Sequence, residues 1–400
     1  MYNKTGYIPQ KGYQNWDIMK PLQRTTLSRR PVAHSVLGYR HTIRFTNDHD
    51  QRYDLAVIVG LAGVNREERQ NHNCSYTEFL QTLSVLQWIL TFLLLGPVCA
   101  LLISWVIYSK LWPVFVMYII WMISDRKTPE RGGRRSIWMS KWIMWKHFRD
   151  YFPIKLHKTT DLDPTLNYIF AYHPHGIMSF GAFCNFGTDS TGFSHIFPSL
   201  KPHLTTLAGN FKVPLYRDYL LAAGMCSVAH SSIDYLLSSQ CSGNAVVIVI
   251  GGAAEALHCT RNKHILTLKK RKGFIRKALT NGASLVPVYS FGENEVLEQY
   301  HFKPGSWKRT LQITFQQWIG FAPCIFFGQG IFSSASKGIM PLRKAINTVV
   351  GKPIPVPKIE NPSEQQVETY HSLYIKSLQD LFNAHKERFG LQQSDSLVLI

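Results

Sequence analysis

The sequence is poor in acidic residues and lacks any regular spacing of cysteines. Lysine and arginine together number 44, whereas aspartate and glutamate number 25, which leaves a formal charge of +19. This surplus predicts an anionic partner, such as nucleic acid, membrane headgroups or a phosphorylated small molecule. The cysteines number 7, and no two of them are spaced C-x-x-C. That pattern argues against a disulfide framework or a zinc finger and favours a reducing compartment.

Charge is absent from two long apolar runs. Neither Phe79–Ser109 nor Leu111–Ser124 contains a charged residue. The first run exceeds the roughly 20 residues that cross a bilayer, and the second is short for a crossing. Basic residues flank the pair on both sides, so the positive-inside rule predicts a membrane hairpin over residues 79–124 with both termini in the cytosol. A single span is the alternative.

The segments on either side of this hairpin are rich in basic residues. Residues 1–78 are weakly patterned and lack the apolar run of a signal peptide, so we expect a flexible cytosolic tail. Residues 125–152 contain Trp138, Trp142 and Trp145 at the spacing i, i+4, i+7, interleaved with lysine and arginine. This composition is typical of a helix that lies in the headgroup layer, and an amphipathic core helix is the alternative.

Residues 153–400 alternate between strand-like and helix-like patterns, which predicts an α/β domain with a mostly parallel sheet flanked by helices. The predicted strands are 167–172, 204–209, 244–252, 283–291 and 347–351. Predicted helices cover 234–239 and 269–282. A longer amphipathic helix near the C-terminus is expected to begin with a capping box of Ser363 and Gln366 and to end at Gly390.

Polar motifs follow three of the predicted strands. His173 and His175 end the first, Gly251-Gly252 with Glu255 ends another, and the stretch from Tyr289 to 295 ends a third. Because ligands of open α/β sheets bind at the carboxyl ends of the strands, we expect these motifs to form one site.

The two histidines allow three interpretations. They could chelate a metal; Gly176, Ile177 and Met178 supply no further ligand, but His203, His230, His258 and His264 remain possible ligands. They could simply belong to a turn. They could also act as a general base that takes a proton from an attacking hydroxyl, with Glu255 hydrogen-bonded to the imidazole. In that third case we expect His175, which follows Pro174, to face the site and His173 to support it.

Several motifs together make the chain recognisable. It resembles the type 2 diacylglycerol acyltransferase family in "YHPHG", "HLTTLAGNF", "GGAAEAL", "LKKRKGFIRKAL", "VPVYSFGENEV" and "VVGKPI", from about residue 83 to residue 389. The resemblance implies transfer of a fatty acyl group from acyl-CoA to diacylglycerol, which makes triacylglycerol at the endoplasmic reticulum membrane and at lipid droplets. Acyl-CoA would be a co-substrate, with no tightly bound cofactor, no metal and no nucleic acid, and a homo-oligomer is an open possibility.

The resemblance also implies a distant kinship with glycerophospholipid acyltransferases, and thus a similar fold. Those enzymes use a His-x4-Asp pair, but here Met178 and Phe180 stand five residues after the two histidines. A carboxylate must then come from elsewhere, which favours Glu255. The Gly-Gly-Ala-Ala-Glu stretch also has no arginine to bind a phosphate, which suits an uncharged acceptor such as diacylglycerol.

Further residues are candidates for substrate binding. The basic run Lys269-Lys270-Arg271-Lys272 could bind the phosphates of coenzyme A, although a solvated helix start would explain it nearly as well. The predicted substrate-binding residues are Pro174, Gly176, Gly251, Gly252, Asn210, Lys269, Arg271, Lys272 and Tyr289. Three other functions remain open: acylation of monoacylglycerol, retinol or a long-chain alcohol, metal-dependent hydrolysis at a membrane, and a tether without catalysis.

Overall fold

The computed structural model describes residues 51–238, 242–331 and 335–400, with side chains from residue 76 onwards. The chain divides into two units, Met1–Val64 and Asn65–Ile400. In the first unit only the beginning of helix α1 is described, and residues 1–50 of the predicted tail lie outside the described residues. All other elements belong to the second unit.

Helix α1 covers Gln51–Tyr108 and continues through Pro97, while α2 covers Trp112–Ser124. The last part of the tail predicted at 1–78, residues 51–78, is therefore helical, and the flexibility of the tail stays a prediction. Of the described helices, only the Tyr76–Tyr108 part of α1 is long and apolar enough to cross a membrane. The short α2 contains no buried residue. A membrane hairpin therefore stays a prediction.

The predicted tryptophan helix is two helices. α3 (Ile137–Ser140) and α4 (Ile143–Tyr151) follow the short 3-10 helix η1 (Thr128–Glu130), and the chain bends between them. Because of this bend the three indoles do not share one face. Trp138 is 72% exposed, whereas Trp145 is 1% exposed and donates a hydrogen bond from Nε1 to the Met139 carbonyl, 2.6 Å away. The single indole face was therefore wrong: Trp145 belongs to the core.

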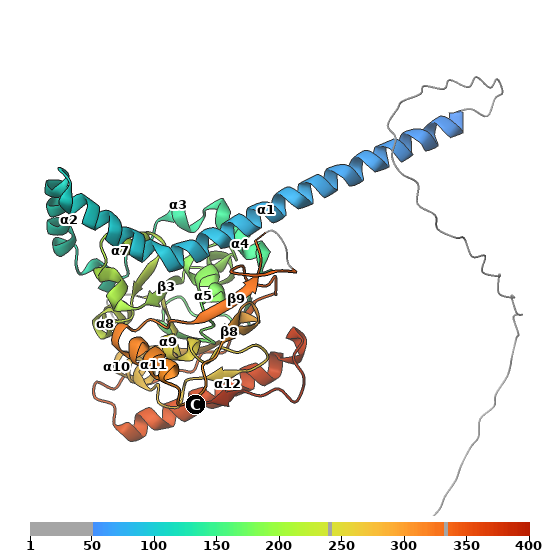
Figure 1. Ribbon diagram of the computed structural model, residues 1–400. Coiled ribbons are helices and arrows are strands. Elements are labelled where there is room, and N and C mark those ends of the chain that lie inside the picture. The colour runs from blue at the N-terminus through green and yellow to red at the C-terminus, as the bar shows by residue number, and fades with distance from the viewer. Residues whose placement is uncertain (1–50, 239–241, 332–334) are drawn as a thin grey trace, which may run out of the picture. The chain divides into compact units, whose positions relative to one another are not determined.

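A seven-stranded sheet forms the centre of the second unit (Figure 1), in the order β1-β11-β7-β2-β5-β3-β4. All neighbouring pairs are parallel except β11 with β7. The mostly parallel sheet is thus confirmed. The strands are β1 (Lys155–Lys158), β2 (Tyr168–His173), β3 (Lys201–Thr206), β4 (Met225–Ser227), β5 (Asn244–Val249), β7 (Ser284–Phe291) and β11 (Asn347–Val350).

Four of the five predicted strands match to within a few residues, and β1 and β4 were not predicted. The strand predicted at 204–209 corresponds to β3, which lies earlier because the 3-10 helix η3 begins at Ala208 and ends the strand. The other helices are α5 (Phe180–Ala182), η2 (Phe183–Gly187), α6 (Phe193–Ile196), η3 (Ala208–Lys212), α7 (Tyr216–Ala222), α8 (His230–Leu237), α9 (Gly252–Ala256), α10 (Gly273–Asn281), η4 (Glu293–Glu295), α11 (Trp307–Ile319), α12 (Glu364–His385) and η5 (Glu387–Phe389). The short outer strands are β6 (Ile265–Leu266), β8 (Glu298–Tyr300), β9 (Ile325–Gln329), β10 (Lys337–Gly338) and β12 (Val398–Leu399).

Helices cover both faces of the sheet because alternate side chains of each buried strand point to opposite faces. In β2, Tyr168, Phe170 and Tyr172 pack in one core cluster with Val85, Trp88 and Ile89 of α1. Ile169 and Ala171 pack in a second cluster with α10 and α12. α1 and α12 accordingly lie on opposite sides of the sheet in Figure 1. The predicted capping box of Ser363 and Gln366 at the start of α12 is confirmed.

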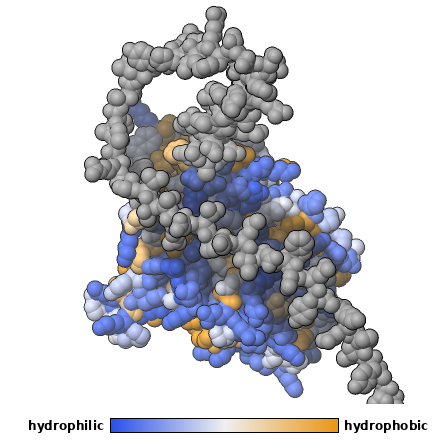
Figure 2. Space-filling model, turned by 90° about the vertical axis from the view of Figure 1, so that its right-hand side faces the viewer, coloured by the Kyte–Doolittle hydropathy of each residue, from blue (hydrophilic) through white to orange (hydrophobic). Residues whose placement is uncertain are grey.

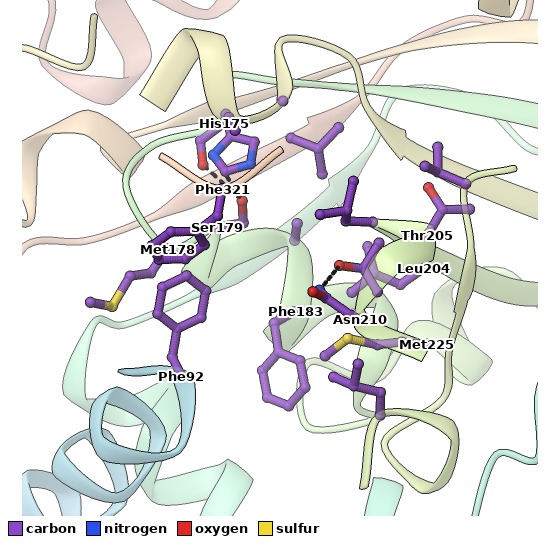
Figure 3. A pocket seen from close by; sticks show the side chains of 18 of the residues that line it. Phe92, His175, Met178, Ser179, Phe183, Leu204, Thr205, Asn210, Met225 and Phe321 are labelled. Carbon is purple, nitrogen blue, oxygen red and sulfur yellow. Dashed lines mark hydrogen bonds between the residues drawn. The ribbon is translucent and has the colours of Figure 1, made fainter. Parts of the chain in front are cut away.

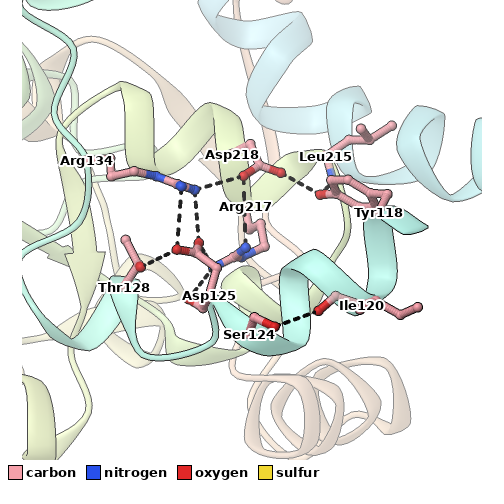
Figure 4. A network of polar contacts seen from close by, with 9 residues as sticks. All are labelled: Tyr118, Ile120, Ser124, Asp125, Thr128, Arg134, Leu215, Arg217 and Asp218. Atoms are coloured by element: carbon pink, nitrogen blue, oxygen red, sulfur yellow. Dashed lines mark hydrogen bonds and ion pairs between the residues drawn. The ribbon is translucent and has the colours of Figure 1, made fainter. Parts of the chain in front are cut away.

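A polar network joins the end of α2 to α7 (Figure 4). Arg217 of α7 is 1% exposed, and its guanidinium lies 3.0 Å from the Asp125 carboxylate that follows α2. Arg134 also binds Asp125, at 3.0 Å. The hydroxyl of Tyr118 in α2 donates to Asp218 at 2.5 Å. These contacts attach the second apolar helix to the helix that carries Tyr216 and Tyr219.

Hydrophilic and large hydrophobic side chains are concentrated on different parts of the protein surface. The face shown in Figure 2 is largely hydrophilic, and its hydrophobic residues are scattered in small patches. Most of the large exposed hydrophobic side chains belong instead to α1, α2 and α11. For α1 and α2 this exposure is what a lipid-facing helix requires.

Candidate active site

A cavity of about 270 Å³ lies at the carboxyl ends of the parallel strands, between the sheet and α1. Its strand side is formed by residues at or just after the ends of β2, β3, β4 and β5. Helix α1 contributes Trp88, Thr91 and Phe92 to its lining, and Phe92 lies 5.9 Å from Phe321, measured between ring centroids. Most of the lining side chains are apolar, with a few polar groups such as His175, Ser179 and Asn210 among them (Figure 3). Such a cavity suits a lipid chain that carries one polar reacting end.

His175 points into this cavity and has one ring nitrogen occupied. Its Nδ1 lies 3.0 Å from the Gly176 carbonyl oxygen. A carbonyl oxygen only accepts, so Nδ1 carries the proton in this contact. Nε2 makes no hydrogen bond within the described part of the chain, and the residue lines the cavity. Burial lowers the pKa of His175, which keeps the ring neutral near pH 7 and able to accept a proton.

His173 lies on the other side of the sheet. It is the last residue of β2 and is completely buried. Its Nε2 is 2.9 Å from the hydroxyl of Tyr374, on α12. Burial lowers the pKa of His173 to about 3, so the ring is neutral throughout the physiological range. The two histidines therefore do not point toward a common ligand, because the strand alternation sends His173 toward α12 and the turn after it sends His175 toward α1.

Glu255 meets the histidine motif through the backbone. Its Oε1 accepts a hydrogen bond from the backbone N–H of His175 at 2.7 Å, and Oε2 accepts one from the N–H of Thr267 at 2.7 Å. The predicted hydrogen bond between this carboxylate and the imidazole is thus wrong, because the carboxylate is placed against the main chain. Glu255 is 2% exposed, and this burial raises its pKa to about 7. The two N–H donors and the charge of Arg271 partly offset that rise.

Gly251 and Gly252, which precede Glu255, occupy two different kinds of position. A Cβ on Gly251 would lie 2.2 Å from the Glu255 carboxyl group, so only hydrogen fits there. Gly252 has φ +57° and an open space beside it, and it lines the cavity. The prediction that the His-Pro-His-Gly and Gly-Gly-Ala-Ala-Glu motifs meet at one strand edge is therefore confirmed.

The third motif contributes a carboxyl group that the sequence did not single out. Glu293 follows β7, is 1% exposed, and accepts hydrogen bonds at Oε2 from the Gly181 N–H at 2.9 Å and the Tyr172 hydroxyl at 3.0 Å. Burial raises the pKa of Glu293 to about 7. Its position after a buried strand and directly after Gly292 was the available signal, and Glu255 likewise follows a buried strand and a glycine pair within a few residues.

The remaining predicted substrate-binding residues are divided between the site and other places. Asn210 lines the cavity and donates to the Thr206 hydroxyl at 3.4 Å. Pro174 and Gly176 are buried beside His175 and do not line the cavity. Tyr289 is buried on the α12 side of the sheet, with its hydroxyl 3.1 Å from His264 Nδ1, and is not part of the cavity lining.

The basic run precedes α10, which begins only at Gly273, and so the helix predicted at 269–282 starts later than expected. Lys269 and Arg271 are exposed, whereas Lys272 forms an ion pair with Glu368 at 2.5 Å. None of the three lines the cavity.

The described residues contain no group of three or more histidine, cysteine, aspartate or glutamate side chains that could hold a metal ion. The cysteines whose side chains are described, Cys99, Cys184, Cys226, Cys259 and Cys324, are free.

The chain is similar to known proteins over most of its length. The family model described as Diacylglycerol acyltransferase matches residues 104–400. Diacylglycerol O-acyltransferase 2 of Danio rerio is 56% identical over 320 residues, which are 80% of this chain and 89% of that relative. Diacylglycerol O-acyltransferase 2 of Homo sapiens is 52% identical over 318 residues, 80% and 82% of the two chains. The human 2-acylglycerol O-acyltransferase 3 is 49% identical over 323 residues, 81% and 95% of the two chains. No solved structure matches the chain.

Proposed function

Since this chain belongs to the diacylglycerol acyltransferase family, we propose that it transfers a fatty acyl group from acyl-CoA to the free hydroxyl of diacylglycerol and so makes triacylglycerol. One observation carries the proposal at the level of the site. His175, whose Nε2 has no hydrogen-bond partner within the described residues, lines an apolar cavity, and one wall of that cavity is a helix of membrane-spanning length. Both lipid substrate and lipid product would dissolve in the bilayer beside such a site.

His175 is the proposed general base. Its Nε2 takes the proton of the diacylglycerol hydroxyl as the hydroxyl oxygen attacks the thioester carbonyl carbon. The resulting intermediate collapses, the carbon–sulfur bond breaks, and the imidazolium returns the proton to the departing coenzyme A thiolate. The hydrogen bond from Nδ1–H to the Gly176 carbonyl supports this role, because it fixes the tautomer whose Nε2 accepts.

Glu255 is the proposed support of this base. It accepts a hydrogen bond from the backbone N–H of His175 and so fixes the backbone position from which the imidazole side chain extends. His173 acts in the same way from the other side, because its hydrogen bond to Tyr374 holds the end of β2 against α12. Both residues would then act on the position of His175 and not on the substrate.

The surroundings of the site extend the proposal to substrate delivery. The apolar α1 and α2 would form the membrane hairpin, with both termini in the cytosol, at the endoplasmic reticulum membrane and the lipid droplet surface. Acyl-CoA would then approach from the cytosol, and the exposed Lys269 and Arg271 are the candidates for its phosphates. The mostly parallel sheet with its site at the carboxyl ends of the strands supports a glycerolipid acyltransferase-like fold.

The test is acyl transfer by membranes that contain the chain or its His175→Ala variant at equal amounts. We expect the variant to lose roughly 100-fold or more of the rate, the usual contribution of a general base. A variant that keeps its rate within a few-fold of the parent would refute the assignment of the base.

A second acceptor is favoured by one observation. The relative that is 49% identical carries the name 2-acylglycerol O-acyltransferase 3, so monoacylglycerol is a candidate acceptor too. A panel of diacylglycerol, monoacylglycerol, retinol and a long-chain alcohol, offered with one labelled acyl-CoA, decides between them. Preferential labelling of diacylglycerol is the expected result.

A further inference from the structure

The segment from Gly176 to Gly181 connects the histidine motif to α5, and one buried side chain outside that segment packs against Gly176 and hydrogen-bonds to Gly181. This side chain is Glu293, at the start of η4. Its Oε2 accepts hydrogen bonds from the Gly181 N–H at 2.9 Å and from the Tyr172 hydroxyl at 3.0 Å. Its Oε1 is buried without a hydrogen-bond partner within the described residues. Such a costly burial of a carboxyl group calls for an explanation other than stability.

The fit of Glu293 against the segment is close enough to require glycine at two positions. A Cβ on Gly176 would lie 2.9 Å from Glu293 Cγ. A Cβ on Gly181 would lie 2.6 Å from Glu293 Oε2 and 2.6 Å from the Tyr172 hydroxyl. Real Cβ atoms do not approach that closely, so the side chain of Glu293 fills the space between the two glycines.

The position of Gly176 matters for the histidine, because its carbonyl oxygen accepts the Nδ1–H bond of His175. A shift of the Gly176 peptide would release this bond and let the imidazole rotate or change tautomer. Glu255 cannot prevent that shift, since it holds His175 only by the backbone N–H, on the other side of the residue.

We propose that Glu293 is a positioning residue for acyl transfer: it fixes the Gly176 carbonyl, and through it the tautomer and direction of the His175 imidazole. The inference rests on the proposed function of His175 as the base. Glu293 touches neither substrate in this arrangement, because it does not line the cavity. Its loss should therefore lower kcat and leave the KM for acyl-CoA nearly unchanged.

Three substitutions test whether Glu293 matters as a hydrogen-bond acceptor that positions the segment, as a negative charge or as a side chain that fills space. Glu293→Ala removes both the acceptor and the filler, and we expect kcat to fall by roughly 10- to 100-fold, since a misplacement of about 1 Å can cost that much. Glu293→Gln keeps the volume and one acceptor oxygen for Gly181 and Tyr172, while its amide nitrogen replaces the unpartnered Oε1. It should keep kcat within a few-fold. Glu298→Gln is the matched control, because Glu298 pairs with Arg261 away from the segment and should leave kcat and KM unchanged.

The experiment measures kcat and KM for acyl-CoA in membranes at equal protein amounts for these variants, for His175→Ala, and for the double variant. If Glu293 acts through His175, Glu293→Ala added to His175→Ala should cause no further loss, because residues that act as one unit are not additive. A normal kcat in Glu293→Ala, a change confined to KM, or an additive double variant would each overturn the inference.

Two further results keep the test decisive. If Glu293→Ala yields no folded protein, Tyr172→Phe removes only the hydroxyl that donates to Oε2. It should lower kcat several-fold at unchanged KM, and an unchanged kcat would overturn the inference. An inactive His175→Ala beside a normal Glu293→Ala refutes this inference alone. An active His175→Ala refutes the proposed base, and the inference with it.

Discussion

Gly251 and Gly252 are adjacent glycines that should respond very differently to alanine. The added methyl of Gly251→Ala would lie 2.2 Å from the Glu255 carboxyl group and 2.5 Å from Glu255 Cβ. The carboxyl end of a side chain can usually move aside, but here the Cβ of Glu255 is also in the way and is fixed to the backbone of α9. Both carboxylate oxygens are also hydrogen-bonded. The methyl must therefore displace Glu255 from the N–H of His175.

The size of the effect follows from that one contact. A hydrogen bond to a charged group contributes about 2 kcal/mol. If its loss is felt fully in the transition state, the rate falls by about 30-fold, since about 1.4 kcal/mol corresponds to a factor of ten. Gly252→Ala adds a methyl with no atom within 4 Å, at φ +57°. It should cost about 1 kcal/mol of stability through backbone strain and leave the rate within a few-fold.

The assay is transfer of a labelled acyl group from acyl-CoA into triacylglycerol by membranes that contain equal amounts of each variant. Wild-type activity of Gly251→Ala would show that the Glu255 contact does not matter for catalysis. Equal damage by both substitutions would show that backbone strain, and not the displaced carboxylate, is the cause.

Three other predictions concern single side chains. Tyr374→Phe removes the partner of His173 and should cost about 1 kcal/mol of stability with activity kept within a few-fold; a 100-fold loss of activity would give His173 a direct role. Trp145→Ala should destabilise the protein by about 3–5 kcal/mol in thermal unfolding because the indole is buried, whereas Trp138→Ala should not, and equal effects would contradict the division between the two indoles. The folded pKa of Glu255 is raised to about 7 from 4.5, so its contribution to stability is present below pH 4.5 and is lost as pH rises through 7. The free energy of unfolding should therefore fall by on the order of 3 kcal/mol between pH 4.5 and pH 7 because of this group, and Glu255→Gln should remove that fall. If the variant shows the same dependence of stability on pH as the parent, Glu255 is not a buried carboxyl group that titrates in this range.

The sequence alone determined the elements with a strong local signal. The buried strands are continuous runs of valine, isoleucine and aromatic residues, and α12 carries its own capping box and apolar face, so both were predicted to within a few residues. β1 and β4 were missed because they are only 4 and 3 residues long and lack such a run. The meeting of the histidine and glycine motifs was predictable too, because parallel strands bring their carboxyl ends to one edge.

Only the tertiary structure decided how each polar group is used. The sequence places His173 and His175 two residues apart, but the sheet and the turn send them to opposite sides, toward Tyr374 and toward the cavity. Glu255 reaches a backbone N–H and not a ring, since that depends on how α9 packs against a loop 80 residues away. Trp145 shares the spacing of Trp138 and is nevertheless core, because the chain bends between α3 and α4. Periodicity reports which face a side chain would take in a regular element, but the contacts that it makes are set by distant segments that no local pattern encodes.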